Sequence, residues 1–157
     1  MKPHLQVFKR LTERLKLLRF TKRGTSWWQR KHGSLWQRVH IHKFTFAESF
    51  RVHSTIHIAG VEDEACSLTG IHSFDGWFER KRLGIPVRRF KFEYDDSPES
   101  ISKCAVELSD YIEQCVIPWF EEWEDEKTLL TSSKSPLHDP QKQFLKELKF
   151  TTSLAHP

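Results

Sequence analysis

The sequence predicts an α+β fold: an antiparallel sheet of about four to five strands, an N-terminal helix, and a long C-terminal helix packed on one face of the sheet. Residues 35–58 contain two long segments that alternate apolar and polar side chains, as half-buried strands do. Residues 98–120 instead repeat apolar side chains every three or four positions, as one face of a helix does. The 157 residues, 38% of them hydrophobic, suit one domain of ordinary size.

The first elements are expected to be an amphipathic helix and a hairpin. Residues 4–20 carry apolar side chains three or four positions apart, with Lys and Arg between them, and Gly24 is a natural stop for this helix. The segment His32-Gly33-Ser34 has the composition of a hairpin turn. It would join a strand that ends near Arg30 to a longer strand at 35–46.

Further strands are expected at 50–59, 66–74 and 87–94, followed by the long helix. Ser97 would be the N-cap and Pro98 the first helical residue, and Pro118 is expected to kink the last turns. We expect residues 1–124 to form a single domain. Residues 125–157 would form a tail with a linker and one short helix beginning at Asp139.

The stretch RVHIHKFTFAESFRVHSTIHIA at 38–59 places four histidines on one face of the predicted sheet. A two-residue turn at Ala47 and Glu48 would set His42 opposite His53. The face would then carry the following side chains: Arg38, His40, His42, Phe44, Arg51, His53, Thr55 and His57. The apolar residues of the two strands would point the other way, into the core.

Clustered imidazoles raise the question of a metal site or a catalytic site. Neutral imidazole is a good ligand for zinc, copper or nickel, but no carboxylate falls on the face to orient one, and Arg38 and Arg51 border it. No nucleophile motif and no phosphate-binding loop accompanies the histidines. We therefore expect no metal, no cofactor and no enzymatic activity. A histidine-using or metal-dependent enzyme on the 38–57 face is the alternative.

Charge is distributed unevenly along the chain. Residues 1–91 hold 19 Lys and Arg against 7 Asp and Glu, whereas residues 92–157 hold 6 against 14. Basic residues interleave with Phe at 79–92, so a nucleic-acid-binding module is a second alternative.

An acidic cluster with an aromatic residue follows the long helix and is typical of a surface for a basic protein partner. The expected partner-binding residues are therefore Glu121, Glu122, Trp123, Glu124 and Asp125, together with Arg38, His40, His42, His53 and His57.

The expected location of the protein and the expected state of its cysteines both depend on sequence features that are missing. No apolar run approaches the roughly 20 residues of a membrane span, and the N-terminus lacks the apolar block of a signal peptide. We expect a cytoplasmic protein with no membrane partner. The three cysteines, Cys66, Cys104 and Cys115, contain no CxxC pair and are expected to be small buried residues rather than a disulfide framework.

Two segments resemble a known family. FTKRGTSWWQR at 20–30 and YIEQCVIPWFEEW at 111–123, with the strand pair between them, are similar to the small cytosolic bacterial proteins grouped as domain-of-unknown-function family 4304. The matching residues of the first segment are Phe20, Lys22, Gly24, Trp27 or Trp28, and Arg30. The resemblance covers roughly residues 5–124 and implies no catalytic residues. By analogy with small solitary cytosolic domains, it suggests an immunity protein that neutralises a bacterial toxin.

Overall fold

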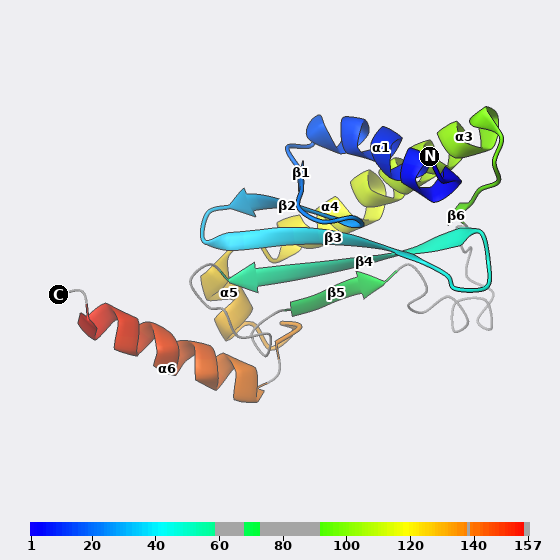
Figure 1. Ribbon diagram of the computed structural model, residues 1–157. Coiled ribbons are helices and arrows are strands. Elements are labelled where there is room, and N and C mark those ends of the chain that lie inside the picture. The colour runs from blue at the N-terminus through cyan, green and yellow to red at the C-terminus, as the bar shows by residue number, and fades with distance from the viewer. Residues whose placement is uncertain (59–67, 73–91, 138, 156–157) are drawn as a thin grey trace, which may run out of the picture.

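The structure is a computed structural model that describes residues 1–58, 68–72, 92–137 and 139–155, with side chains at 1–58, 92–137 and 139–147 (Figure 1). The basic segment at 79–91, Cys66 and most of the strand expected at 87–94 lie outside the described residues.

An antiparallel sheet with the strand order β1-β2-β3-β4-β5 forms the centre of the fold, and β6 also pairs with β4. Helices lie at both ends of the chain, which confirms the α+β prediction (Figure 1). The strands are β1 Thr21–Lys22, β2 Trp27–His32, β3 Leu35–Lys43, β4 Ser49–Ile58, β5 Leu68–His72 and β6 Phe92–Glu93. Gly33, with φ of 58°, occupies the predicted turn between β2 and β3.

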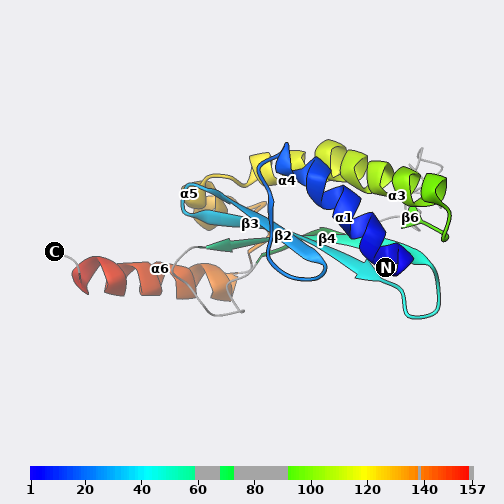
Figure 2. The same ribbon diagram turned by 45° about the horizontal axis from the view of Figure 1, so that its top comes forward.

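The helices α1, α3 and α4 lie on one face of this sheet (Figure 2). The helical elements are α1 Pro3–Lys16, α3 Pro98–Tyr111, the π-helix η2 Ile112–Val116, α4 Ile117–Glu122, α5 Glu126–Thr131 and α6 Asp139–Ala155. Among the residues that the structure describes, none of the helices combines the length and apolar character that a membrane crossing requires.

α1 ends well before Gly24, where the sequence placed its stop. The N–H of Phe20 donates to the carbonyl of Leu15 at 3.0 Å, and the N–H of Arg19 donates to the carbonyl of Lys16 at 2.9 Å. Arg19 has φ of 65°, so these two bonds close the helix in a Schellman motif with an arginine in the left-handed position that glycine usually takes. Gly24 serves another purpose, described below.

The register between β3 and β4 differs from the prediction by two residues. The connection is a loop at 44–48, not a two-residue turn at Ala47 and Glu48, and the N–H of Phe44 donates to the carbonyl of Ser49 at 3.1 Å. His40 therefore lies opposite His53, and His42 lies opposite Arg51. Because the shift is two residues, every side chain keeps the face that the alternation predicted.

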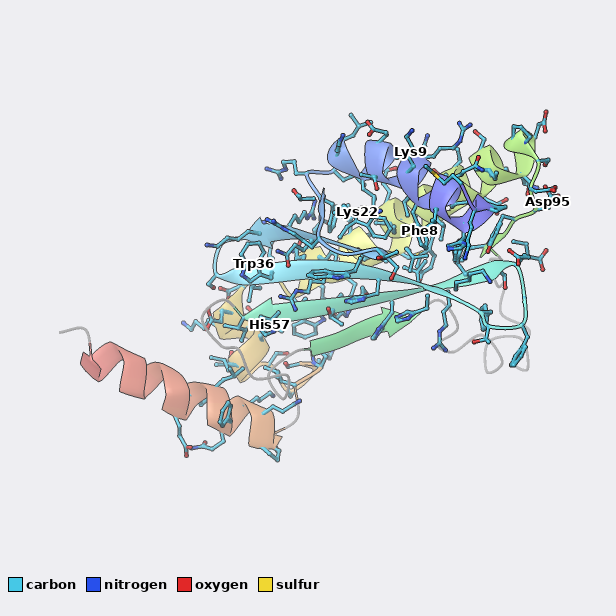
Figure 3. All side chains as sticks on the ribbon, viewed as in Figure 1. Phe8, Lys9, Lys22, Trp36, His57 and Asp95 are labelled. Atoms are coloured by element: carbon cyan, nitrogen blue, oxygen red, sulfur yellow. The ribbon has the colours of Figure 1, made fainter. Side chains whose placement is uncertain are left out.

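The core lies between the helices and the apolar face of the sheet. Fully or almost fully buried side chains come from α1 (Val7, Phe8, Leu11, Leu15), from β3 and β4 (Leu35, Val39, Ile41, Phe50, Val52, Ile56, Ile58) and from α3 (Ile101, Cys104, Ala105, Leu108). Figure 3 shows Phe8 between α1 and the sheet and Lys9 on the outer side of the same helix. The apolar stripes that predicted these elements are thus the surfaces that pack together.

The long helix begins where the sequence places it. The Ser97 hydroxyl accepts a hydrogen bond from the N–H of Ser100 at 3.2 Å, and Pro98 follows the cap. A π-helical turn at Ile112–Val116 precedes Pro118. Proline lacks an N–H and its ring crowds the preceding turn of an α-helix, so a wider turn accommodates it.

The C-terminal segment contains more helix than predicted. The predicted tail contains α5 in addition to α6, and α6 is 17 residues long, so the expectation of one short helix was wrong. Leu129, Leu137 and Leu145 are buried and belong to the same hydrophobic cluster as the sheet and α1.

Candidate binding face of the sheet

The surface of β2, β3 and β4 that points away from the apolar core is the candidate site, and we call it the histidine face. Its members are Trp27, Gln29 and Lys31 from β2; Trp36, Arg38, His40 and His42 from β3; and Arg51, His53, Thr55 and His57 from β4. All are half-buried or exposed, and none is acidic. Trp36 and His57 are directly opposed, as their labels on β3 and β4 in Figure 3 show.

The five predicted partner-binding residues of this face all lie on it: Arg38, His40, His42, His53 and His57. They do so because each strand sends alternate side chains to the same face, and the intervening residues are buried in the core. On β5, the Cα of His72 pairs with that of His53.

Aromatic rings form a column across the middle of the histidine face. The rings of Trp27 and His40 stack with centroids 5.7 Å apart and 10° between their planes. The rings of His40 and His42 stack at 5.8 Å and 12°. His53 lies beside both, with its centroid 6.4 Å from that of His40 and 6.0 Å from that of His42. Three imidazoles thus share one small region.

Gly24 explains how Trp27 reaches this column. A methyl group at Gly24 would overlap the indole ring of Trp27, so the ring lies directly against the glycine backbone. The N–H of Arg23 donates to the Trp27 carbonyl at 3.0 Å and holds this loop on β2. The absence of a side chain at position 24 is what leaves room for the indole.

The environment of His40 and His42 favours the neutral form of their imidazoles. Burial, together with the nearby His42, His53 and Arg38, lowers the pKa of His40 from 6.5 to about 4. Burial also lowers the pKa of His42, with additional effects of Arg51 and His53. His40 and His42 are therefore neutral at neutral pH, and the positive charge beside them comes from arginine.

The cations of the histidine face lie over aromatic rings. The three pairs are Arg38 over Trp27 at 5.4 Å, Lys31 over Trp36 at 5.7 Å and Arg51 over Phe44 at 5.8 Å, measured from the charged group to the ring centroid. The Nε of Arg38 also donates to Oε1 of Gln29 at 3.2 Å. Rings and amides hold these cations in place without neutralising them.

Within residues 1–58, 68–72, 92–137 and 139–155, no group of three or more His, Cys, Asp and Glu side chains is arranged to hold a metal ion. What the described part of the histidine face offers is ring surface, imidazole nitrogens and fixed positive charge.

Two of the four acids predicted as a second binding surface contact the rest of the fold. Oε2 of Glu124 lies 3.5 Å from Nε2 of His32, at the β2–β3 turn. Asp125 caps α5: it accepts from the Thr128 hydroxyl at 2.8 Å and from the Thr128 N–H at 3.0 Å, and these bonds lower the pKa of its carboxyl. Glu121 and Glu122 are exposed.

Trp123 does not form an exposed anchor, and that expectation was wrong. Its side chain is only 6% exposed and belongs to the hydrophobic core cluster. The helix ends at this residue, whose φ of −118° turns the chain away from the helical path and allows the indole to fold inward. The acids on either side of Trp123 therefore have no exposed aromatic residue among them to anchor a partner, as the sequence-based prediction required.

Phe46, in the loop between β3 and β4, was missed as a candidate. Its side chain is 100% exposed, and the loop lies at the end of β3 that carries His42. The sequence signal was present: a phenylalanine directly precedes Ala47, in the stretch that had to contain a turn. It was read as the last residue of a strand because the turn was expected to be shorter.

No family model, no curated protein and no solved structure matches the chain. The class that the geometry defines is an α+β domain with an aromatic and cationic sheet face. The resemblance to family 4304 stays a prediction, and the function has to be inferred from this face.

Proposed function

We propose that this protein is a non-enzymatic binding protein that holds a protein partner against the histidine face, and that it acts as a cytosolic immunity protein that neutralises a bacterial toxin. The observation that carries the binding role is the preorganised ring and cation surface on β2, β3 and β4. The toxin-directed form of the proposal comes from the family resemblance.

The composition of the histidine face is that of an interface centre. Binding energy at protein interfaces concentrates in tryptophan, tyrosine and arginine side chains with restricted motion. Trp27 is held against Gly24 and stacked on His40, and Arg38 is held over Trp27. Ordered side chains lose little conformational entropy when a partner binds, so more of the contact energy appears as affinity.

The exposed Phe46 supports the same assignment. A fully exposed phenylalanine at a loop tip buries a large apolar area if it enters a pocket of a partner. Its loop joins the strands that carry the histidines, so one partner can contact both.

The test begins with affinity purification of the tagged chain from its native host, which recovers any protein bound to it. That protein is identified, produced separately and recombined with the purified chain. We expect His42→Ala with Arg51→Ala to abolish the complex and to abolish protection of cells that express the partner.

The matched control removes two exposed basic residues from α1, by Lys9→Ala with Arg14→Ala, and should leave both readouts unchanged. Equal binding by the two double variants would contradict the assignment of the interface. A complex without any protection would contradict the toxin-directed role alone.

A further inference from the structure

We infer that the partner presents a carboxylate-rich protein surface to the histidine face, and that docking is accompanied by proton uptake at the clustered imidazoles. This inference rests on the proposed function and adds to it the chemistry of the partner and the pH dependence of binding.

The first support is the uncompensated charge of the face. Among the residues that the structure describes, Arg38, Arg51 and Lys31 lie over rings and make no ion pair with a carboxylate. Guanidinium groups bind carboxylates through two parallel hydrogen bonds, and the ring contacts fix the direction in which they point. The complementary surface is therefore negatively charged.

The second support distinguishes a protein from a nucleic acid. Binding of single strands relies on aromatic rings with an open face on which bases stack. The ring of Trp27 already contacts Gly24, His40 and Arg38, and Trp36 carries Lys31 over its ring. The rings therefore orient the cations and are poorly placed as a base-stacking platform, which favours carboxylates over a nucleic acid strand.

The third support is the geometry of the imidazoles. The rings of His40, His42 and His53 lie within 6.4 Å of one another, between Arg38 on β3 and Arg51 on β4. Trp27 and Gln29 face them from β2, and His72 occupies the neighbouring register position on β5. In the free protein, burial and the nearby Arg38 oppose protonation of His40, and burial and the nearby Arg51 oppose protonation of His42.

Arriving carboxylates reverse that balance. A negative charge within a few ångströms of an imidazole favours its protonated form. By linkage, a partner that raises the proton affinity of a histidine binds more tightly when protons are more abundant. Affinity is then expected to rise by up to about tenfold per pH unit for each proton taken up, between about pH 7.5 and pH 5.5.

The experiment uses the full chain and a defined probe, a peptide of about ten residues rich in Glu and Asp. Calorimetric titration should show saturable binding that tightens about tenfold or more from pH 7.5 to pH 5.5. NMR titration of the imidazole resonances should show the pKa of His42 or His53 rising in the complex. His42→Gln with His53→Gln should flatten the pH dependence.

Charge-matched variants separate this face from general attraction. Arg38→Gln with Arg51→Gln should weaken peptide binding by at least about tenfold, whereas Lys9→Gln with Arg14→Gln should change it less than about twofold. If the first double variant fails to fold by circular dichroism, Arg51→Gln alone replaces it, because Arg51 is exposed.

Three results would overturn the inference: affinity that does not change with pH, equal losses in the two double variants, or tighter binding of an oligothymidylate of matched length than of the peptide. A chain that ignores the acidic peptide but still forms the host complex through His42 and Arg51 would refute only this inference. Loss of the host complex itself would refute the proposed function.

Discussion

At the scale of the residue, the histidine face depends on Gly24, which lies outside the face and has no side chain. Gly24 leaves the space in which the indole of Trp27 lies, and Trp27 in turn contacts His40 and Arg38. One methyl group at position 24 would therefore disturb the whole column of rings.

We expect Gly24→Ala to displace the Trp27 indole and to weaken binding of the acidic peptide by at least about tenfold, with secondary structure retained. Near-ultraviolet circular dichroism reports the displaced ring, and calorimetry reports the affinity. Gly33→Ala is the control, since no atom lies within 4 Å of its added methyl group but its φ of 58° is strained for alanine. That variant should lose about 1 kcal/mol of stability and keep its affinity, and the opposite pattern would contradict this account.

The exposed Phe46 predicts a change in binding without a change in stability. Phe46→Ser removes an apolar side chain that makes no buried contact in the free protein, so its unfolding midpoint should stay within experimental error. Affinity for the host partner should fall by at least about tenfold. Leu17→Ser is the matched control, because Leu17 is an exposed apolar residue at the end of α1. Equal effects of the two substitutions would remove Phe46 from the interface.

His40 predicts how stability depends on pH. Its pKa is about 4 in the folded protein against 6.5 in an unfolded chain, so the unfolded state binds the proton more readily. The free energy of unfolding should therefore decrease as the pH falls from about 6.5 to about 4, and should not respond to this group above pH 7. Thermal unfolding of the chain and of His40→Gln across that range tests this, and the variant should show the shallower decrease. Parallel curves would contradict it.

At the scale of the element, predictions that depended on nearby residues succeeded. Ser97 and Pro98 define a helix start through bonds within one turn, and the apolar spacing of α3 matches the face that it buries. The sharing of one sheet face by Arg38 and the histidines followed from strand alternation alone.

Predictions failed where contacts between distant residues decide the outcome. The length of the β3–β4 loop sets the register, and nothing in the letters between Phe44 and Ser49 separates a short turn from a longer loop. Trp123 folds inward because the core has room for its indole, which is a property of the assembled layers. Gly24 follows the first helix as a helix stop would, but its role depends on the Trp27 indole, which packs against it only in the folded chain.

The buried face of α3 predicts a large loss of stability. Leu108 is 0% exposed, so Leu108→Ala removes apolar contacts and leaves a cavity, and it should cost about 2–5 kcal/mol of the free energy of unfolding. Val106, on the same helix, is 37% exposed, and Val106→Ala should cost less than about 1 kcal/mol. Chemical denaturation measures both. Similar losses in the two variants would mean that the buried face of α3 has been assigned wrongly.

At the scale of the whole molecule, the acidic cluster and Arg51 lie near opposite ends of β3. The acids that follow α4 meet the β2–β3 turn, where Glu124 approaches His32. His42 and Arg51 lie at the other end, next to the β3–β4 loop. A charged partner therefore experiences an electric field that differs between the two ends of β3, although the net charge is only +4.

Charge reversal at the acidic end tells the two kinds of partner apart. Glu121→Lys with Glu124→Lys removes half-exposed or exposed contacts, so it should cost less than about 1 kcal/mol of stability. An acidic partner that docks on the histidine face should associate faster with this variant, most clearly at low ionic strength. Stopped-flow association rates at two salt concentrations measure this. Slower association would instead indicate a basic partner that docks on the acids.

The β3–β4 loop also determines how this protein could vary without losing its surface. Slippage of a strand by one residue exchanges its inner and outer side chains, whereas slippage by two restores them. Related genes that change β3 or β4 at this loop by an even number of residues could keep the same imidazoles and guanidinium groups facing outward. An odd slip of register would bury Arg38 and His40 and expose Val39 and Ile41, unless a bulge absorbed the extra residue. The loop itself can absorb added residues of either parity, so an odd slip of β3, rather than an odd loop length, would mark a related protein that no longer presents this face.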